Sequence, residues 1–192
     1  SSNRFQILEE LDSNVEMPVQ VTIASGFPKG DKLDLVTQKA TELGAAAIWA
    51  FPADWSVVKW DGKKLAKKED KLAKIALGAA EQSKRNRLPQ VRLFEKKADF
   101  QAELAGFDKI FIAYEESAKE GEMSALAQNL QTVKAGDKLL FIFGPEGGIS
   151  PKEIAAFEEV GAIKVGLGPR IMRTETAPLY ALSVISYSAE LL

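Results

Sequence analysis

The order of apolar runs and helical segments constrains the fold of this chain most strongly. Residues 46–51 and 138–143 are short, nearly continuous apolar runs, which are typical of strands covered on both faces. Residues 19–26 alternate apolar and polar side chains, which also indicates a strand. Segments with helical apolar spacing separate such runs. This alternation predicts a single α/β domain with a mostly parallel sheet and helices on both faces.

The remaining boundaries follow from local signals. Ser150, Pro151 and Glu153 combine an N-cap hydroxyl, a proline at the first helical position and the carboxylate of a capping box, so a helix should begin there. Gly44 should end the helix that Asp31 opens. The other expected strands span 91–94, 109–114 and 163–167, and the other expected helices span 64–84, 99–104 and 122–131, with a last helix from Glu175.

The chain contains no histidine and no cysteine. This excludes imidazole or thiolate metal sites, disulfides, a Ser-His-Asp triad and a cysteine nucleophile. We therefore expect no metal, and any catalysis must use carboxylates, lysine, arginine, tyrosine, hydroxyls or backbone amides. No apolar run is long enough to span a bilayer, so we expect no membrane partner and a cytoplasmic location.

The charge is distributed unevenly. The net charge is only −2, but residues 59–97 hold 13 of the 25 basic residues and five acidic ones, a local charge of +8. Such a region can attract a polyanion. The lysines at 63–74 could equally lie on the solvent-exposed face of a helix that buries Leu65, Leu72, Ile75 and Leu77. The segment 81–87 adds two guanidinium groups and two side-chain amides, which suit phosphates and base edges.

Three expected strand ends carry informative loops, at residues 113–116, 144–148 and 166–170. In open parallel sheets, ligands bind outside the carboxyl ends of the strands. Either glycine cluster could be a plain tight turn or a phosphate-binding turn. A G-x-G-x-x-G pattern that starts at Gly166 fails at Ile171, and no P-loop pattern occurs.

Four motifs together carry a family resemblance. They are Gly144-Pro145-Glu146-Gly147-Gly148, the segment 167–177 (LGPRIMRTETA), Lys39-Ala40-Thr41-Glu42-Leu43-Gly44 and Glu81-Gln82-Ser83-Lys84-Arg85. In this order they resemble the SPOUT superfamily of S-adenosylmethionine-dependent RNA methyltransferases, and within it the bacterial 16S rRNA uridine-N3 methyltransferases of the RsmE type. The resemblance spans about residues 20–192. Met172 departs from the family's usual leucine, a swap that conserves volume.

The resemblance implies a SPOUT methyltransferase domain at 19–192 whose C-terminal segment forms a deep trefoil knot. Residues 1–18 would be the remnant of an N-terminal PUA-like domain or a linker, which also suggests a processed or truncated N-terminus. The last helix would pack in a homodimer. S-adenosylmethionine would be bound mainly by the three loops, through Tyr114, Gly144, Glu146, Gly147, Gly148, Val165, Gly166, Leu167, Gly168, Ile171, Met172 and Arg173.

The resemblance also implies substrate contacts, with 16S rRNA or the small ribosomal subunit as the partner. The expected RNA-binding residues are Lys39, Gln82, Arg85, Arg87, Arg170 and Thr174. For catalysis, we expect Arg173 to stabilise a uridinate, together with the hydroxyl groups of Thr174 and Thr176. Either Glu175 or Glu146 would accept the N3 proton, although each carboxylate could instead be structural.

Three other functions stay open at this point. The chain could be a ribose 2′-O-methyltransferase of the same superfamily, although that branch generally has a different loop in place of residues 144–148. It could be a non-catalytic RNA-binding or ribosome-assembly module that kept the fold. A sugar-phosphate or nucleotide-binding enzyme is a more distant alternative.

Overall fold

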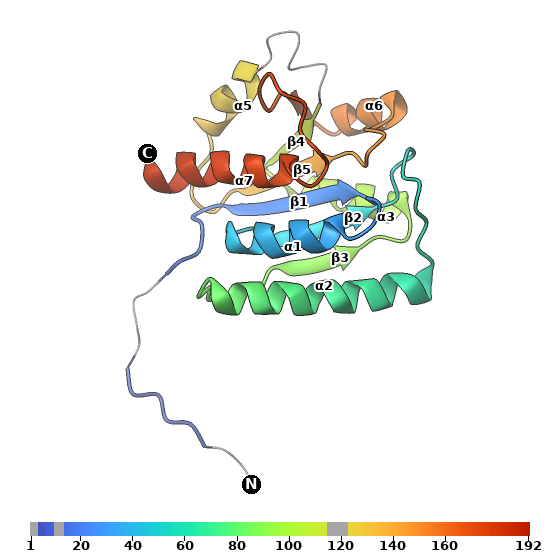
Figure 1. Ribbon diagram of the computed structural model, residues 1–192. Coiled ribbons are helices and arrows are strands. Elements are labelled where there is room, and N and C mark those ends of the chain that lie inside the picture. The colour runs from blue at the N-terminus through green and yellow to red at the C-terminus, as the bar shows by residue number, and fades with distance from the viewer. Residues whose placement is uncertain (1–3, 10–13, 115–122) are drawn as a thin grey trace.

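A computed structural model of the 192-residue chain describes residues 4–9, 14–114 and 123–192. Six strands form one sheet in the order β3-β2-β1-β5-β4-β6, and every neighbouring pair is parallel. Figure 1 shows β1, β2 and β3 pointing the same way, so that their carboxyl ends share one edge. In chain order the strands are Gln20–Gly26 (β1), Ala47–Phe51 (β2), Gln90–Leu93 (β3), Lys109–Ala113 (β4), Lys138–Phe143 (β5) and Ile163–Val165 (β6).

Helices cover both faces of the sheet. The side chains of one face pack with α1, α2, α5 and α7, and those of the other face pack with α3 and α6. The predicted α/β class with a parallel sheet is therefore confirmed. In chain order the helices are Lys32–Glu42 (α1), Gly62–Gln82 (α2), Lys97–Ala102 (α3), Met123–Leu130 (α5), Pro151–Glu159 (α6) and Ala177–Ser186 (α7).

The continuous apolar runs lie where burial on both faces requires them. Every residue of β2 is buried, and in β5 only Lys138 is exposed. Side chains alternate across the sheet, so Phe141 packs with α7 and α1 while Ile142 packs with α3 and α6. This two-sided burial holds β5 rigidly and delivers the loop that follows it to a defined place.

Local signals also hold at the helix ends, with a few corrections. Ser150 and Glu153 form the complete capping box of α6, and Gly44 follows α1 in the left-handed conformation with φ +89°. The last helix begins at Ala177 rather than Glu175 and continues as a π-helical turn, Tyr187–Leu191. Leu77 is exposed, contrary to expectation. Glu115 and Glu116, and the predicted helix start at residue 122, lie outside the described residues.

Within the described ranges, no helix is both long and apolar enough to cross a membrane.

Candidate functional site

The sheet order brings the three loops of interest together. Strands β5, β4 and β6, which precede them in sequence, are neighbours in the sheet. Because parallel strands end at the same edge, the segments after residues 143, 113 and 165 leave the sheet side by side. After β6, at the edge of the sheet, the chain returns to pack α7 against β5 and α1, so residues 166–176 pass beside the loop 144–148 (Figure 1).

The loop 144–148 is a tight turn that needs its glycines. A Cβ atom built at Gly144 would lie 2.6 Å from the carbonyl carbon of Gly148, too close for any side chain. Gly148 itself has φ +82°, in the left-handed region that favours glycine, and its N–H donates to the carbonyl of Pro145 at 2.8 Å. The turn therefore presents backbone rather than side chains to whatever binds at this edge.

Glu146 is held by the segment that precedes α1. Its Oε1 accepts hydrogen bonds from the Lys29 backbone N–H at 3.0 Å and from Lys32 Nζ at 2.8 Å. Burial acts to raise the pKa of Glu146, but the Lys32 ammonium and the amides of Lys29 and Glu146 outweigh it, so that the pKa lies below its usual value. The hydrogen bond to Glu146 in turn raises the pKa of Lys32.

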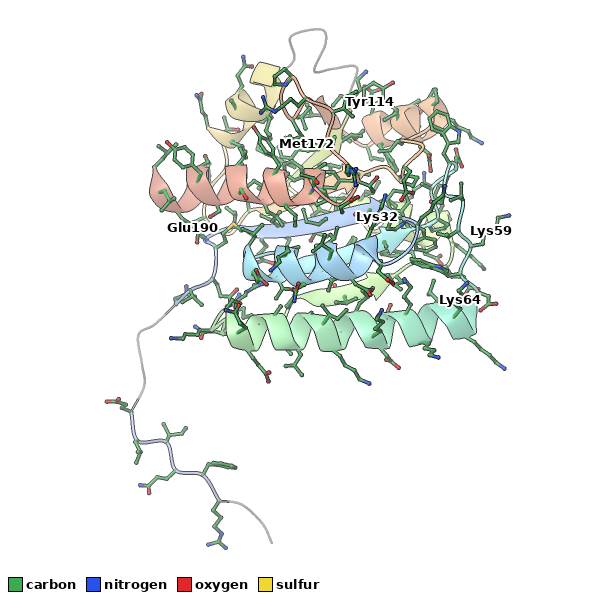
Figure 2. All side chains as sticks on the ribbon, viewed as in Figure 1. Lys32, Lys59, Lys64, Tyr114, Met172 and Glu190 are labelled. Carbon is green, nitrogen blue, oxygen red and sulfur yellow. The ribbon has the colours of Figure 1, made fainter. Side chains whose placement is uncertain are left out.

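Lys32 also contacts the second predicted carboxylate. Its Nζ lies 3.5 Å from Glu175 Oε2, so one ammonium group bridges the loop 144–148 and the segment that leads into α7. Glu175 Oε2 is buried and has no hydrogen-bond partner among the described residues. Figure 2 shows Lys32 at the carboxyl edge of the sheet. The two carboxylates that the sequence singled out thus meet, with Glu146 fully engaged and Glu175 not.

The loop 166–176 carries the other predicted residues. Arg170 and Arg173 are exposed, and neither forms an ion pair within the described part of the chain. The Arg173 carbonyl accepts from the backbone N–H groups of Thr176 and Ala177, at 2.9 and 3.1 Å, so its backbone is fixed while its side chain faces solvent. Ile171 is 78% exposed, and Met172 and Thr174 are partly buried.

Tyr114 and the residues after β6 close the other side of the site. The Tyr114 N–H donates to the Val165 carbonyl at 3.2 Å, and Lys164 Nζ lies 5.8 Å from the centre of the Tyr114 ring. Val165 and Gly166 are buried, and Leu167 and Gly168 are partly buried. Figure 2 shows Tyr114 and Met172 on the same side of the sheet, above Lys32.

A second polar cluster fixes the end of β2 beside this site. Ser150 Oγ donates to Asp54 Oδ2 at 2.6 Å, and the Asp54 N–H donates to Glu153 Oε1 at 2.9 Å. Lys97 pairs with Asp54 and, at 2.6 Å, with Glu153. The hydrogen bonds from Lys97 and Ser150 lower the pKa of Asp54. The capping box of α6 therefore also anchors the segment after Phe51.

The predicted RNA-binding residues do not form one surface. Gln82 and Arg87 are exposed, whereas Lys39 pairs with Glu42 at 2.8 Å on the same helix. The side chain of Arg85 is only 4% exposed. Its guanidinium donates to Glu16 and to the carbonyl groups of Thr41 and Ala45. This placement differs from the expectation, because Arg85 lies at the amino edge of the sheet with its donors already used inside the protein.

Sequence reasoning missed Lys32, Asp54 and Lys97. Each is one charged residue among many in a helix or loop, and its partner is distant in sequence, as with Lys32 and Glu146, which are 114 positions apart. The one available signal is position, since Lys32 and Asp54 both follow a buried strand at its carboxyl end.

The arrangement suits a ligand that is bound mainly by backbone. Glycine-rich turns, a tyrosine ring and a buried carboxylate oxygen with only a long contact to Lys32 line one edge, and two exposed guanidinium groups lie next to it. Within the described residues, no cluster of three acidic side chains is placed to hold a metal. Such a site can align a neutral or cationic ligand and stabilise a developing anion with arginine.

Comparisons with known proteins identify relatives of this chain. A ribosomal RNA small subunit methyltransferase E from Bacillus subtilis is 50% identical over 186 residues, which is 97% of this chain and 73% of the relative. The enzyme of that name from Mycobacterium tuberculosis is 34% identical over 172 residues, which is 86% of this chain and 62% of the relative.

A solved structure extends the likeness to three dimensions. It is a ribosomal RNA small subunit methyltransferase E from Neisseria gonorrhoeae bound to S-adenosyl methionine, with 29% identity, a TM-score of 0.73, and coverage of 94% of this chain and 71% of that one. The model of the RNA methyltransferase domain family matches residues 15–186. About nine-tenths of the described residues lie within that match, and the expected loops meet at one edge of the sheet. The chain therefore belongs to the RNA methyltransferase domain family, of the SPOUT type.

Proposed function

We propose that this protein transfers a methyl group from S-adenosylmethionine to N3 of a uridine in 16S rRNA of the small ribosomal subunit. The observation that carries the proposal is the convergence of three loops at the neighbouring ends of β5, β4 and β6, with Glu146 and Glu175 joined by Lys32. Relatives named ribosomal RNA small subunit methyltransferase E support the substrate class.

The residues at this edge fit the cofactor. S-adenosylmethionine would supply an electrophilic methyl group, so the protein has to bind and align it rather than generate a reactive metal or thiolate. The turn at Gly144–Gly148 and the partly buried Leu167 and Gly168 would offer backbone groups to its polar parts, with Val165 and Gly166 buried behind them, and Tyr114, Ile171 and Met172 offer apolar surface. The side chain of Glu146 would fix the turn, because it is already engaged by Lys29 and Lys32.

The target base must lose its N3 proton to become a nucleophile. The exposed guanidinium of Arg173, with the hydroxyl groups of Thr174 and Thr176, would stabilise the uridinate, and Arg170 would contact the RNA. Of the two carboxylates, Glu175 is the better proton acceptor, because its Oε2 has only the long contact of 3.5 Å with Lys32 Nζ, while Glu146 Oε1 accepts two shorter hydrogen bonds.

The proposal includes four features of the assembly. The return of the chain from β6 across the loop 144–148 to α7 supports a C-terminal trefoil knot. The exposed Tyr180 and Tyr187 of the last helix support a homodimer interface. Residues 1–18 would be the remnant of a PUA-like domain or a linker, since Phe5, Ile7 and Leu8 are nearly fully exposed, although Met17 already packs in the core of the methyltransferase domain. A substrate in the ribosome places the protein in the cytoplasm.

A methyl-transfer assay tests the proposal. The chain is incubated with labelled S-adenosylmethionine and either 16S rRNA or small ribosomal subunits from cells that lack the gene, and the RNA is digested and analysed by mass spectrometry. We expect label in N3-methyluridine. Label in a ribose 2′-O-methyl group would instead identify the other branch of the superfamily, and RNA binding without S-adenosylmethionine affinity in calorimetry would identify a non-catalytic module.

A variant tests the role of Arg173. Because its side chain faces solvent while its backbone is held by Thr176 and Ala177, Arg173→Ala should preserve the loop. We expect turnover to fall at least tenfold while the affinity for S-adenosylmethionine is nearly kept. Near-normal turnover would remove Arg173 from the catalytic group.

A further inference from the structure

Two tryptophans on the loop between β2 and α2, residues 52–61, lie in contrasting environments. Trp60 is buried, and its ring centre lies 4.3 Å from that of Phe27. Trp55 is 47% exposed, and its ring takes part in none of the ring contacts within the described residues. Trp60 therefore holds the loop onto the core, and Trp55 leaves a large apolar face in solvent, which usually indicates a binding surface.

The exposed ring sits on a firmly anchored segment. Its neighbour Asp54 is held by Ser150, Glu153 and Lys97, which lie at the start of α6 and α3, the helices on the sheet face opposite α2. The Ser56 N–H also donates to the Ala53 carbonyl at 3.0 Å. A side chain presented from such a segment does not need to be ordered when a ligand binds, which lowers the entropic cost of binding.

Trp55 lies directly against the proposed cofactor loop. A Cβ atom built at Gly147 would be 3.1 Å from Trp55 Cβ, and one built at Gly148 would be 3.8 Å from an atom of the indole ring. A ligand that rests on Trp55 is therefore next to the turn 144–148.

The charges around Trp55 favour a polyanion. Lys59, Lys63 and Lys64 follow it and are exposed, and Figure 2 shows Lys59 on the loop that leads into α2 and Lys64 at the start of that helix. Three of the nearby acids are engaged within the protein: Asp61 accepts from the Lys64 backbone N–H at 3.0 Å, Asp54 pairs with Lys97, and Glu146 pairs with Lys32. Glu95, whose carboxylate lies beside Gly62, is exposed, so the three lysines outnumber the acid that stays in solvent. An aromatic face with flanking cations is the combination that binds single-stranded nucleic acid.

We propose that Trp55 stacks on a base of single-stranded RNA beside the target uridine, while Lys59, Lys63 and Lys64 contact the phosphates that follow. This inference rests on the proposed function for the identity of the substrate as RNA. It adds a binding surface that the four sequence motifs do not contain, since residues 52–61 lie outside all of them.

Binding measurements test the inference. A short, uridine-rich, fluorescently labelled single-stranded RNA is titrated with the chain, and affinity is read from anisotropy. We expect Trp55→Ala to weaken binding about tenfold and Trp55→Phe, which keeps an aromatic face, to weaken it less. Val160→Ala serves as the control, because Val160 is also exposed but lies at the end of α6, away from the site, and its affinity should equal that of the unaltered protein.

Intrinsic fluorescence gives an independent readout. The same RNA without a label should quench the emission of the unaltered protein more than that of Trp55→Phe, because only the first carries the exposed indole. Equal RNA affinities for Trp55→Ala and the control would overturn the inference. Quenching by S-adenosylmethionine alone would assign the Trp55 ring to the cofactor site. A change in Trp55 emission that depends only on protein concentration would assign the ring to an interface with a second copy of the chain. Either result would also overturn the inference.

Failure of this inference is distinguishable from failure of the proposed function. If Trp55→Ala leaves RNA affinity unchanged while the protein still methylates rRNA, only the stacking role is lost. If the RNA binds through Trp55 but calorimetry detects no S-adenosylmethionine binding, only the methyltransferase proposal is lost.

Discussion

Two ion clusters lie at opposite edges of the same sheet and differ in how completely their polar atoms are paired. At the amino edge, the Arg85 guanidinium donates to Glu16, Thr41 and Ala45, and Glu16 also accepts from the backbone N–H groups of residues 86 and 87. At the carboxyl edge, Lys32 joins Glu146 and Glu175, but Glu175 Oε2 has no hydrogen-bond partner within the described residues.

This difference separates a cluster that stabilises the fold from a cluster that can take part in binding or catalysis. A buried cluster in which every donor and acceptor is paired holds its elements together and has nothing left to offer a ligand. A cluster in which one buried oxygen has only a long ion-pair contact, as Glu175 Oε2 has with Lys32 at 3.5 Å, keeps an energetic cost that a substrate proton or donor can remove. We therefore assign the amino-edge cluster to folding and the carboxyl-edge cluster to function, and the following changes test that assignment.

The largest effect should come from Arg85→Met. It leaves Glu16, with a side chain only 10% exposed, as a buried charge without its cation, so the free energy of unfolding should fall by about 3–5 kcal/mol. Urea unfolding measures the loss. The folded fraction should bind S-adenosylmethionine with unchanged affinity.

Arg92→Met is the matched control for this change. Arg92 also pairs with a glutamate, Glu103, at 2.7 Å, but the two side chains are 38% and 40% exposed. Solvent screening limits such a pair to about 1 kcal/mol or less. Equal losses in the two variants would contradict the structural role that we give to Arg85.

The next effect concerns the two carboxylates. Glu175→Gln should lower single-turnover methyl transfer about a hundredfold, because it removes the proposed proton acceptor. Glu146→Gln should lower it less, because Glu146 Oε1 already accepts two hydrogen bonds from the protein and acts on the shape of the loop. The reverse order would exchange the roles of the two residues.

A smaller effect, about tenfold on turnover, should follow Lys32→Met, since the two carboxylates then lose their shared cation. Lys32 contributes to the lowered pKa of Glu146, so its removal should raise that pKa. Because Glu146 shapes the loop 144–148, activity in the pH–rate profile should then fall at a higher pH, as this carboxylate becomes protonated. Lys32→Arg should restore part of the activity. Lys71→Met, which removes an exposed ion pair with Asp34 on the same layer of helices, should leave both rate and profile unchanged.

The smallest effect is a pH dependence of stability. Burial acts to raise the pKa of Glu16, but Arg85 and the amides of residues 86 and 87 outweigh it, so the pKa lies below the ordinary value of 4.5. A lowered folded-state pKa gives stability that is present above the unfolded pKa and is lost as pH falls through the folded pKa. Unfolding free energies measured from pH 6 downward should therefore fall more steeply below about 4.5 in the unaltered protein than in Glu16→Gln. Parallel curves would contradict the pairing of Glu16.

Local patterns predicted most of the fold. The apolar runs at 46–51 and 138–143 became fully packed parallel strands because continuous apolar side chains require cover on both faces. Ser150 and Glu153 capped their helix as expected, since the capping box needs only residues three positions apart. Leu77 was placed wrongly because helical spacing indicates an apolar stripe but not its width.

The site was only partly predictable. The glycine-rich turn and the segment 167–177 could be found from sequence because glycines and an arginine-threonine cluster are unusual in a helix or strand interior. Arg85 was expected to contact RNA because a guanidinium suits both phosphate and carboxylate. In the structure it pairs with Glu16, which is 69 positions away, and no local pattern indicates such a pair.

The sequence alone determined the order of strands and helices, the helix ends marked by Gly44 and Ser150, the loops that carry chemistry and the resemblance to RNA methyltransferases, because each depends on neighbouring residues or on motifs of a few residues. Only the tertiary structure decided which charges meet: Lys32 with Glu146 and Glu175, Asp54 with Lys97, and Arg85 with Glu16. Those pairings arise because parallel strands bring segments that are distant in sequence together at an edge of the sheet. Burying a charge there costs free energy unless a protein group or a ligand pairs with it.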